Sequence, residues 1–170
     1  VTEIGNYAFY GCEIGSTVEL SNSITKIGEG AFRGNPIEYY SVSGENKFYS
    51  SDLNGVLYNK DKTILIQYPI SNPRTSFSIP NGVTTIESYS FGDGWTSSGD
   101  GTEIIEKVIV PDTVKTIKDY AFYSCQRLKY VDLGESLTYI GQYAFSQCEN
   151  LSEISIPDSV ETIENGAFSY

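Results

Sequence analysis

The sequence predicts a repeat solenoid built mainly from β-strands, and three observations lead to this prediction. First, a motif that ends in alanine or serine followed by phenylalanine recurs along the chain. Its phenylalanines are separated by 23, 59, 31, 23 and 23 residues, and they are Phe9, Phe32, Phe91, Phe122, Phe145 and Phe168. A fixed period of this length is typical of solenoids, in which each turn buries its apolar side against its neighbours. Second, each period carries a strand pattern, and third, prolines end several of these strands.

The strand pattern is clearest at Leu128, Val131 and Leu133, which have the spacing L-x-x-L-x-L. This spacing is the strand signature of a leucine-rich repeat. Because side chains alternate along a strand, we expect the fourth and sixth positions to point into the core and the third and fifth to point outward. Proline cannot donate a hydrogen bond to a sheet, so it ends a strand that it follows directly. The prolines in this position are Pro80, Pro111 and Pro157.

We expect about six turns to stack as a right-handed superhelix, with one parallel β-sheet on its concave face. The six strands of this sheet end at Leu20, Val42, Ile79, Val110, Leu133 and Ile156. At about 4.8 Å per strand, the sheet should be roughly 25 Å across. The I-x-x-x-A-F half of each turn is expected to form the opposite wall, where Ile and Phe side chains stack on their equivalents in neighbouring turns.

Two intervals depart from the period of about 23 residues. In the longer interval, segments 56–58 and 63–68 predict a β-hairpin that replaces the usual outer wall, within an atypical unit at 43–80. In the 31-residue interval, a glycine-rich loop is inserted at 92–103. We expect a single domain over residues 1–170. We also expect it to be a piece of a longer protein, because both ends fall in mid-repeat without a polar cap.

The composition argues against several classes of partner. The 170 residues carry a net charge of −11, and the isoelectric point is near 4.3. This charge disfavours nucleic acid and anionic membrane surfaces. No apolar run is long enough to span a bilayer, so no membrane insertion is expected. Hydrophobic residues make up 39 % of the chain, which is ample for a folded core.

Histidine is absent from the sequence, which removes the commonest general base and the commonest zinc ligand. Cys12, Cys125 and Cys148 each follow a motif phenylalanine by three residues. We therefore interpret them as buried, small apolar side chains at one position of the repeat. A disulfide between Cys125 and Cys148 is the alternative, although parallel side chains on adjacent turns give it poor geometry. We expect no catalytic residue, no cofactor and no metal.

The candidate binding surface is the outward face of the strands. The candidate ligand-binding residues are Tyr39, Lys107, Ile109, Tyr130, Asp132 and Glu153. The aromatic and aliphatic members would serve as anchors, and the charged members as their polar neighbours. Repeat proteins commonly bind partners on such a face. The alternative is a solvated sheet in which tyrosine is present for its β-propensity, and the sequence leaves both interpretations open.

The loop insertion is a second candidate, because it contains Trp95, the single tryptophan of the chain. A lone tryptophan in a polar, glycine-rich loop suits contact with a partner. The alternatives are a solvated insertion and a calcium site. Asp93, Ser97 and Glu103 offer oxygen ligands, but the EF-hand spacing is missing.

Two of the candidate residues, Asp132 and Glu153, also permit a remote enzymatic alternative. They lie on adjacent predicted strands, at a separation of about 5–8 Å that overlaps the range used by glycoside hydrolases with two carboxylates. A pair of solvated carboxylates on a sheet is the simpler interpretation.

The repeat resembles the BspA-type leucine-rich repeat family, whose pattern runs roughly I-P-x-x-V-x-x-I-G-x-x-A-F-x-x-C-x-x-L-x-x-I-x-I-P. Residues 114–156 match it almost throughout, and the resemblance covers essentially the whole chain. The chain departs from the pattern at the hairpin unit, at the Trp95 loop and at Asn35, which replaces the cysteine. The resemblance implies an extracellular or cell-surface protein that adheres to host matrix proteins or to other microbes, and it supplies no catalytic residues. A structural spacer without a ligand of its own is the alternative function.

Overall fold

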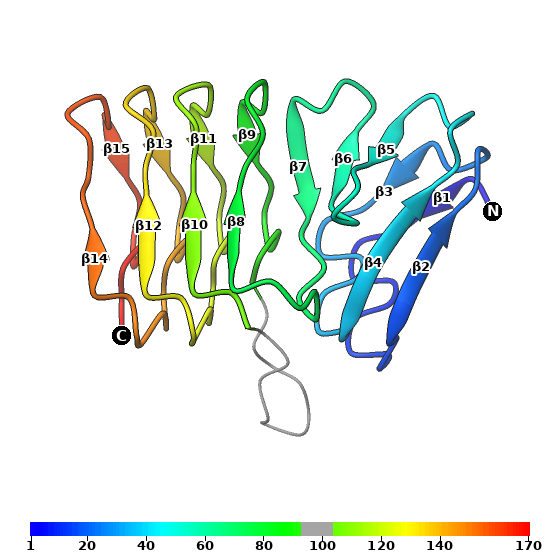
Figure 1. Ribbon diagram of the computed structural model, residues 1–170, viewed down its shortest axis with the longest axis horizontal. Coiled ribbons are helices and arrows are strands. Elements are labelled where there is room, and N and C mark those ends of the chain that lie inside the picture. Colours follow the sequence, from blue (N-terminus) through cyan, green and yellow to red (C-terminus); the bar gives the residue numbers. More distant parts are fainter. Residues whose placement is uncertain (93–103) are drawn as a thin grey trace.

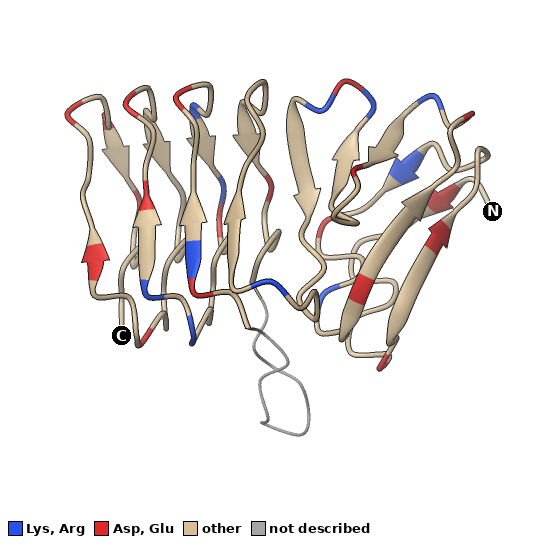
Figure 2. Cartoon of the chain, in the orientation of Figure 1, with Lys and Arg blue, Asp and Glu red and all other residues tan. Residues whose placement is uncertain are grey.

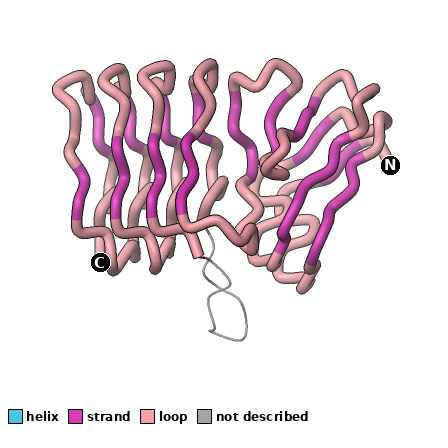
Figure 3. Tube along the Cα trace, in the orientation of Figure 1, coloured by secondary structure: helices cyan, strands magenta, loops and turns pink. Residues whose placement is uncertain are grey.

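The computed structural model describes residues 1–92 and 104–170, and these residues form a β-solenoid of about seven turns (Figure 1). They contain fifteen strands and no helix (Figure 3). The strands lie in two walls with apolar side chains packed between them. The predicted solenoid is therefore confirmed.

The first wall contains all six strands predicted from the leucine-rich pattern. They are β2 (Ser16–Leu20), β4 (Ile37–Val42), β8 (Ser76–Ser78), β10 (Lys107–Ile109), β12 (Tyr130–Asp132) and β14 (Glu153–Ile154). Neighbouring strands pair in parallel, and the predicted alternation holds. In the central strands, Val108 and Val131 are buried, whereas Lys107 and Asp132 are exposed.

The opposite wall is built from the I-x-x-x-A-F segments and from the atypical unit. Its short strands are β1 (Glu3–Ile4), β3 (Lys26–Ile27), β9 (Thr85–Ile86), β11 (Thr116–Ile117), β13 (Tyr139–Ile140) and β15 (Thr162–Ile163). The atypical unit adds β5 (Tyr49–Ser51), β6 (Leu57–Asn59) and β7 (Ile64–Gln67). The predicted hairpin is confirmed, because β6 and β7 are antiparallel and β7 pairs in parallel with β9 of the wall. The third strand, β5, was not predicted.

The prediction of one continuous six-stranded sheet is wrong. Strands β2 and β4 form one sheet, and β8, β10, β12 and β14 form another, tilted relative to the first in Figure 1. The atypical unit is the physical reason, since the chain leaves β4 and makes three strands in the opposite wall before it returns as β8. The outer edge of β4 is covered by a turn instead, where the Tyr40 amide donates to the Gly55 carbonyl at 2.9 Å. The opposite wall is divided within the same part of the chain, between β3 and the sheet that ends in β5.

Stacked aromatic rings run through the core, as the repeat predicts. Consecutive ring centroids from Phe91 through Phe122 and Phe145 to Phe168 are separated by 4.6, 4.8 and 5.2 Å. The structure adds a fifth ring to this stack that the motif did not reveal. The Tyr68 ring stacks on Phe91 at 5.0 Å, and it lies 23 residues before it, so the atypical unit also contributes an aromatic ring.

The cysteine position has a polar role beyond the predicted apolar one. The buried thiol of Cys148 donates to the Phe122 carbonyl of the preceding turn at 3.1 Å, and Cys125 and Cys148 carry thiols rather than a disulfide. Asn35, at the same position, donates in the same way to the Phe9 carbonyl at 2.6 Å. Cys12 is exposed, so the prediction of burial is wrong there; its thiol donates to the nearby Tyr10 carbonyl at 3.8 Å.

Candidate functional site

Five of the six candidate binding residues lie together on the outward face of β8, β10, β12 and β14, which we call the strand face. The parallel register places Lys107 beside Tyr130, and Tyr130 beside Glu153. Two residues further along the same two strands, Ile109 lies beside Asp132. Figure 2 shows the charged strand positions along this wall, and they are of mixed sign. The strand face thus combines a cation, two carboxylates and two partly exposed apolar or aromatic side chains.

Lys107 and Tyr130 form a direct interaction on this face. The Lys107 ammonium nitrogen lies 4.7 Å from the centroid of the Tyr130 ring. A cation within about 6 Å of a ring face is attracted by the ring quadrupole, by about 0.5–1 kcal/mol at an exposed site. This contact restrains both side chains, so part of the face is organised before any partner arrives.

A hollow of about 380 Å³ lies next to this pair, over β12 and β14. Its lining includes Tyr130, Asp132 and Glu153, and also Glu135, which was not predicted from the sequence. Glu135 lies in the turn after the strand, at a position that carries an acidic residue in three successive turns. These residues are Asp112, Glu135 and Asp158. That recurrence in the sequence is a signal by which Glu135 could have been found.

Tyr39 does not join the other candidates. It lies on β4, in the separate two-stranded sheet, and its hydroxyl donates to the Asp52 carbonyl at 3.2 Å. A Cβ atom on Gly55 would come within 2.4 Å of the Tyr39 ring, so the ring packs directly on that glycine. The atypical unit therefore uses Tyr39 to hold its own turn in place.

The remaining candidates are constrained less by the structure. Trp95 and the calcium candidates Asp93, Ser97 and Glu103 lie outside the described residues. Asp132 and Glu153 are exposed and lie on adjacent strands, offset by two residues along the strand.

Within residues 1–92 and 104–170, no group of three or more acidic or cysteine side chains is placed to hold a metal ion. No helix among these residues is long and apolar enough to cross a membrane.

A row of tyrosines on the opposite wall was also missed. Tyr89, Tyr120 and Tyr143 each precede a motif phenylalanine by two residues and have positive φ angles of 54–60°. Their rings stack at 5.0 and 5.3 Å between centroids. The Arg33 guanidinium lies 4.4 Å from the Tyr89 ring. Tyr89 is buried in this row, and Tyr120 and Tyr143 are partly buried.

Comparison with known proteins gives consistent results. The family described as "BspA type Leucine rich repeat region" matches in six copies, over residues 1–91 and 100–170. Among curated proteins, none matches the chain. Several solved structures do match it, and among them are three that cover at least 95 % of this chain.

The pneumococcal vaccine antigen PcpA is 26 % identical with a TM-score of 0.83, over 95 % of this chain and 38 % of its own. A leucine-rich cell surface protein from Faecalibacterium prausnitzii is 26 % identical with a TM-score of 0.70, over 99 % of this chain and 55 % of its own. A leucine-rich repeat protein from Eubacterium ventriosum is 30 % identical with a TM-score of 0.51, over 99 % of this chain and 62 % of its own. The chain thus spans less than two thirds of the length of each.

Proposed function

Because the chain belongs to the BspA-type leucine-rich repeat family, we propose that it is a binding module at the surface of a cell, and that it holds a protein partner on the strand face. The observation that carries this proposal is the cluster of Lys107, Ile109, Tyr130, Asp132 and Glu153 on one sheet. Rigid β-strands present these side chains in fixed register. An aromatic ring flanked by charges of both signs suits a protein surface better than a uniformly charged polymer.

The location at a cell surface is supported by one of the similar structures. The Faecalibacterium prausnitzii protein is described as a cell surface protein, and the similarity extends over 99 % of this chain. A host matrix protein or a surface protein of another microbe is the kind of partner that the family resemblance suggests. The acidic chain, with a net charge of −11, would favour a partner region that is neutral or basic.

The first test is surface plasmon resonance against fibronectin, fibrinogen, laminin and collagen, at physiological salt and with and without calcium. Saturable binding to one of them, lost in the double variant Ile109→Ser/Tyr130→Ser, would support the strand face as the binding site. Tyr139→Ser is the matched control, because Tyr139 is a partly exposed strand tyrosine on the opposite wall. Equal binding by the double variant and the wild type would refute the proposed site. A flat response to the whole panel would favour a structural spacer.

A further inference from the structure

An unpaired strand edge lies where the opposite wall is divided. In the turns that are followed by another turn, two backbone carbonyls of the wall strand accept amide protons from the next turn. Examples are Thr84 with Lys115, Ile86 with Lys118, and Ile140 with Glu164, at 2.8–3.0 Å. The corresponding carbonyls of the second turn belong to Thr25 and Ile27. Neither carbonyl accepts a hydrogen bond from any other described residue.

The same edge also has unpaired donors. The amides at the motif phenylalanine position donate to the next turn, and these are Phe9, Tyr68, Phe91, Phe122 and Phe145. Phe32 is at this position and has a following turn, yet its amide meets no acceptor within the described ranges, and neither does that of Gly30. Two carbonyls and two amides are therefore left along one edge, from residue 25 to residue 32. Backbone groups of folded proteins are rarely left without partners.

Two features of the next unit explain the unpaired edge: β7 pairs with β6 rather than with β3, and the segment after β7 is shortened. The register aligns Leu65 with Ile86, but Tyr68 follows Leu65 by only three residues, whereas Phe91 follows Ile86 by five. The third unit therefore lacks the residues that would form the turn facing Gly30. One group on this same edge is already satisfied, because the Ile27 amide donates to a side chain, the Tyr49 hydroxyl, at 2.8 Å.

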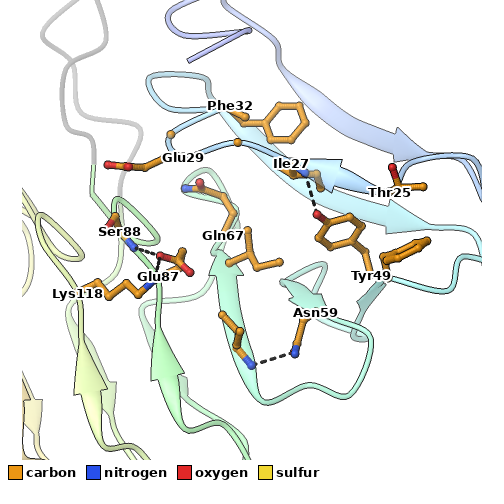
Figure 4. Close-up of a pocket in the computed structure, with 16 residues that line it drawn as sticks. Thr25, Ile27, Glu29, Phe32, Tyr49, Asn59, Gln67, Glu87, Ser88 and Lys118 are labelled. Atoms are coloured by element: carbon orange, nitrogen blue, oxygen red, sulfur yellow. Dashed lines mark hydrogen bonds and ion pairs between the residues drawn. The ribbon is translucent and has the colours of Figure 1, made fainter. Parts of the chain in front are cut away.

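The missing turn leaves a groove of about 460 Å³, which we call the junction groove (Figure 4). All four residues of the unpaired edge, Thr25, Ile27, Gly30 and Phe32, line it. Its apolar lining also includes Phe48 and Ile66, and its polar lining includes Asn59 and Gln67. An occupant of this groove can therefore both pair with the strand edge and bury apolar side chains.

The charges of the junction groove restrict the occupant further. Glu29 and Glu87 both line it, and Lys118 is bound to Glu87 at 2.7 Å. One carboxylate, that of Glu29, has no cation within salt-bridge distance among the described residues. A free anion is therefore disfavoured, although the Gly30 and Phe32 amides alone would suit one. A ligand with both carbonyls and amides, and with a positive side chain, fits all of these groups.

We infer that the junction groove binds an extended peptide segment of a partner protein, which carries a basic side chain and adds as a strand to the edge from Thr25 to Phe32. Strand addition of this kind takes its affinity from main-chain hydrogen bonds and its specificity from side-chain contacts. Here the basic side chain lies near Glu29, and alternate apolar side chains lie on Phe48 and Ile66. This site is on the opposite wall from the strand face, so it does not depend on the proposed function.

The first part of the test needs no ligand. Amide hydrogen exchange of Gly30 and Phe32 is compared by NMR with that of Tyr120 and Phe122, which are at the same repeat positions but donate to the next turn. We expect the amides of the unpaired edge to exchange at least about tenfold faster. Equal protection at both pairs of positions would overturn the inference, because the edge would then be closed.

The second part uses a defined probe, the peptide acetyl-Thr-Val-Thr-Lys-Thr-Val-Thr-amide. We expect it to shift the Gly30 and Phe32 resonances saturably and to slow their exchange. The variant Glu29→Gln should weaken binding by about fivefold, whereas Glu153→Gln on the strand face should not. The same peptide with Glu in place of Lys should bind more weakly. The same peptide N-methylated at every residue should not bind, because no residue keeps a main-chain amide proton for pairing.

Three results would overturn the inference. One is no saturable shift at Gly30 or Phe32 with the lysine peptide up to about 5 mM. Another is equal binding of the lysine, glutamate and N-methylated peptides. The third is shifts confined to the strand face. Failure of the strand-face variants in the plasmon assay would leave these readouts unchanged, so the two proposals can fail independently.

Discussion

Gly141 lies so close to the preceding turn that a Cβ atom on it would be 2.5 Å from the amide nitrogen of Asp119. The Asp119 carboxylate accepts a hydrogen bond from the Gln142 amide at 2.8 Å and so holds the two turns together. Gly28 and Asn6 repeat this arrangement, since a Cβ on Gly28 would be 2.4 Å from the Asn6 amide nitrogen. An Asp or Asn in one turn is thus coupled to a glycine in the next.

The variant Gly141→Ala should therefore destabilise the protein by about 2–3 kcal/mol, because two of the three closest atoms belong to the backbone and cannot rotate away. Gly5→Ala is a matched control. Gly5 is at the same repeat position, but a Cβ atom added to it would have no neighbour within 4 Å. We expect a change below about 0.5 kcal/mol for this control. Urea unfolding measures both values, and equal effects of the two variants would contradict the proposed coupling.

The second prediction concerns the buried amide that replaces cysteine. Asn35 donates to the Phe9 and Phe32 carbonyls at 2.6 and 2.8 Å and accepts from the Ile14 amide at 3.0 Å. Asn35→Ala should cost about 2–4 kcal/mol, because it leaves buried and partly buried backbone groups without partners. Asn35→Cys should cost less, since a thiol at this position donates to the preceding phenylalanine carbonyl, as Cys148 does. Equal losses of unfolding free energy for the two variants would contradict this role of the thiol.

The third prediction concerns the stacked aromatic rings. Phe122 is 0 % exposed and stacks on rings on both sides, at 4.6 and 4.8 Å. Phe122→Ala should cost about 3–5 kcal/mol. Phe168→Ala removes the same side chain from the end of the stack, where it is 39 % exposed, and should cost less than half as much. Thermal and urea unfolding measure both, and similar losses would mean that stacking on two sides adds nothing.

The sequence predicted most turns correctly because their apolar positions recur with a constant period. It missed the aromatic ring of Tyr68 because Gln67 stands in the alanine position and the unit is two residues shorter between strand and ring. The Gln67 amide instead donates to the Tyr89 and Ser90 carbonyls at 3.1 and 3.2 Å. A motif search that requires alanine or serine before the aromatic residue cannot find such a substitution.

The candidate site was predicted in part, for a related reason. The alternation of inward and outward side chains along a strand predicts that Ile109 and Tyr130 point outward, and this agrees with the structure. It does not tell whether successive strands are neighbours, so Tyr39 was placed on the same surface wrongly. The junction groove could not be predicted either. It depends on backbone groups of the second turn whose usual partners are missing from the third.

The last prediction concerns alkaline pH. Burial raises the pKa of Tyr40 and, together with the nearby Asp52 carboxylate, that of Tyr58. Both phenols stay protonated in the folded protein at a pH where they ionise in the unfolded chain, near about 10. Above that pH the unfolded state binds fewer protons than the folded state, so stability falls as pH rises. The stabilisation from these two phenols is fully present below about pH 10. Above about pH 10, each tyrosine lowers the free energy of unfolding by about 1.4 kcal/mol per pH unit. Tyr40→Phe should reduce this slope, measured by urea unfolding between about pH 8 and 11.5. An unchanged slope in Tyr40→Phe would show that this phenol ionises equally in both states.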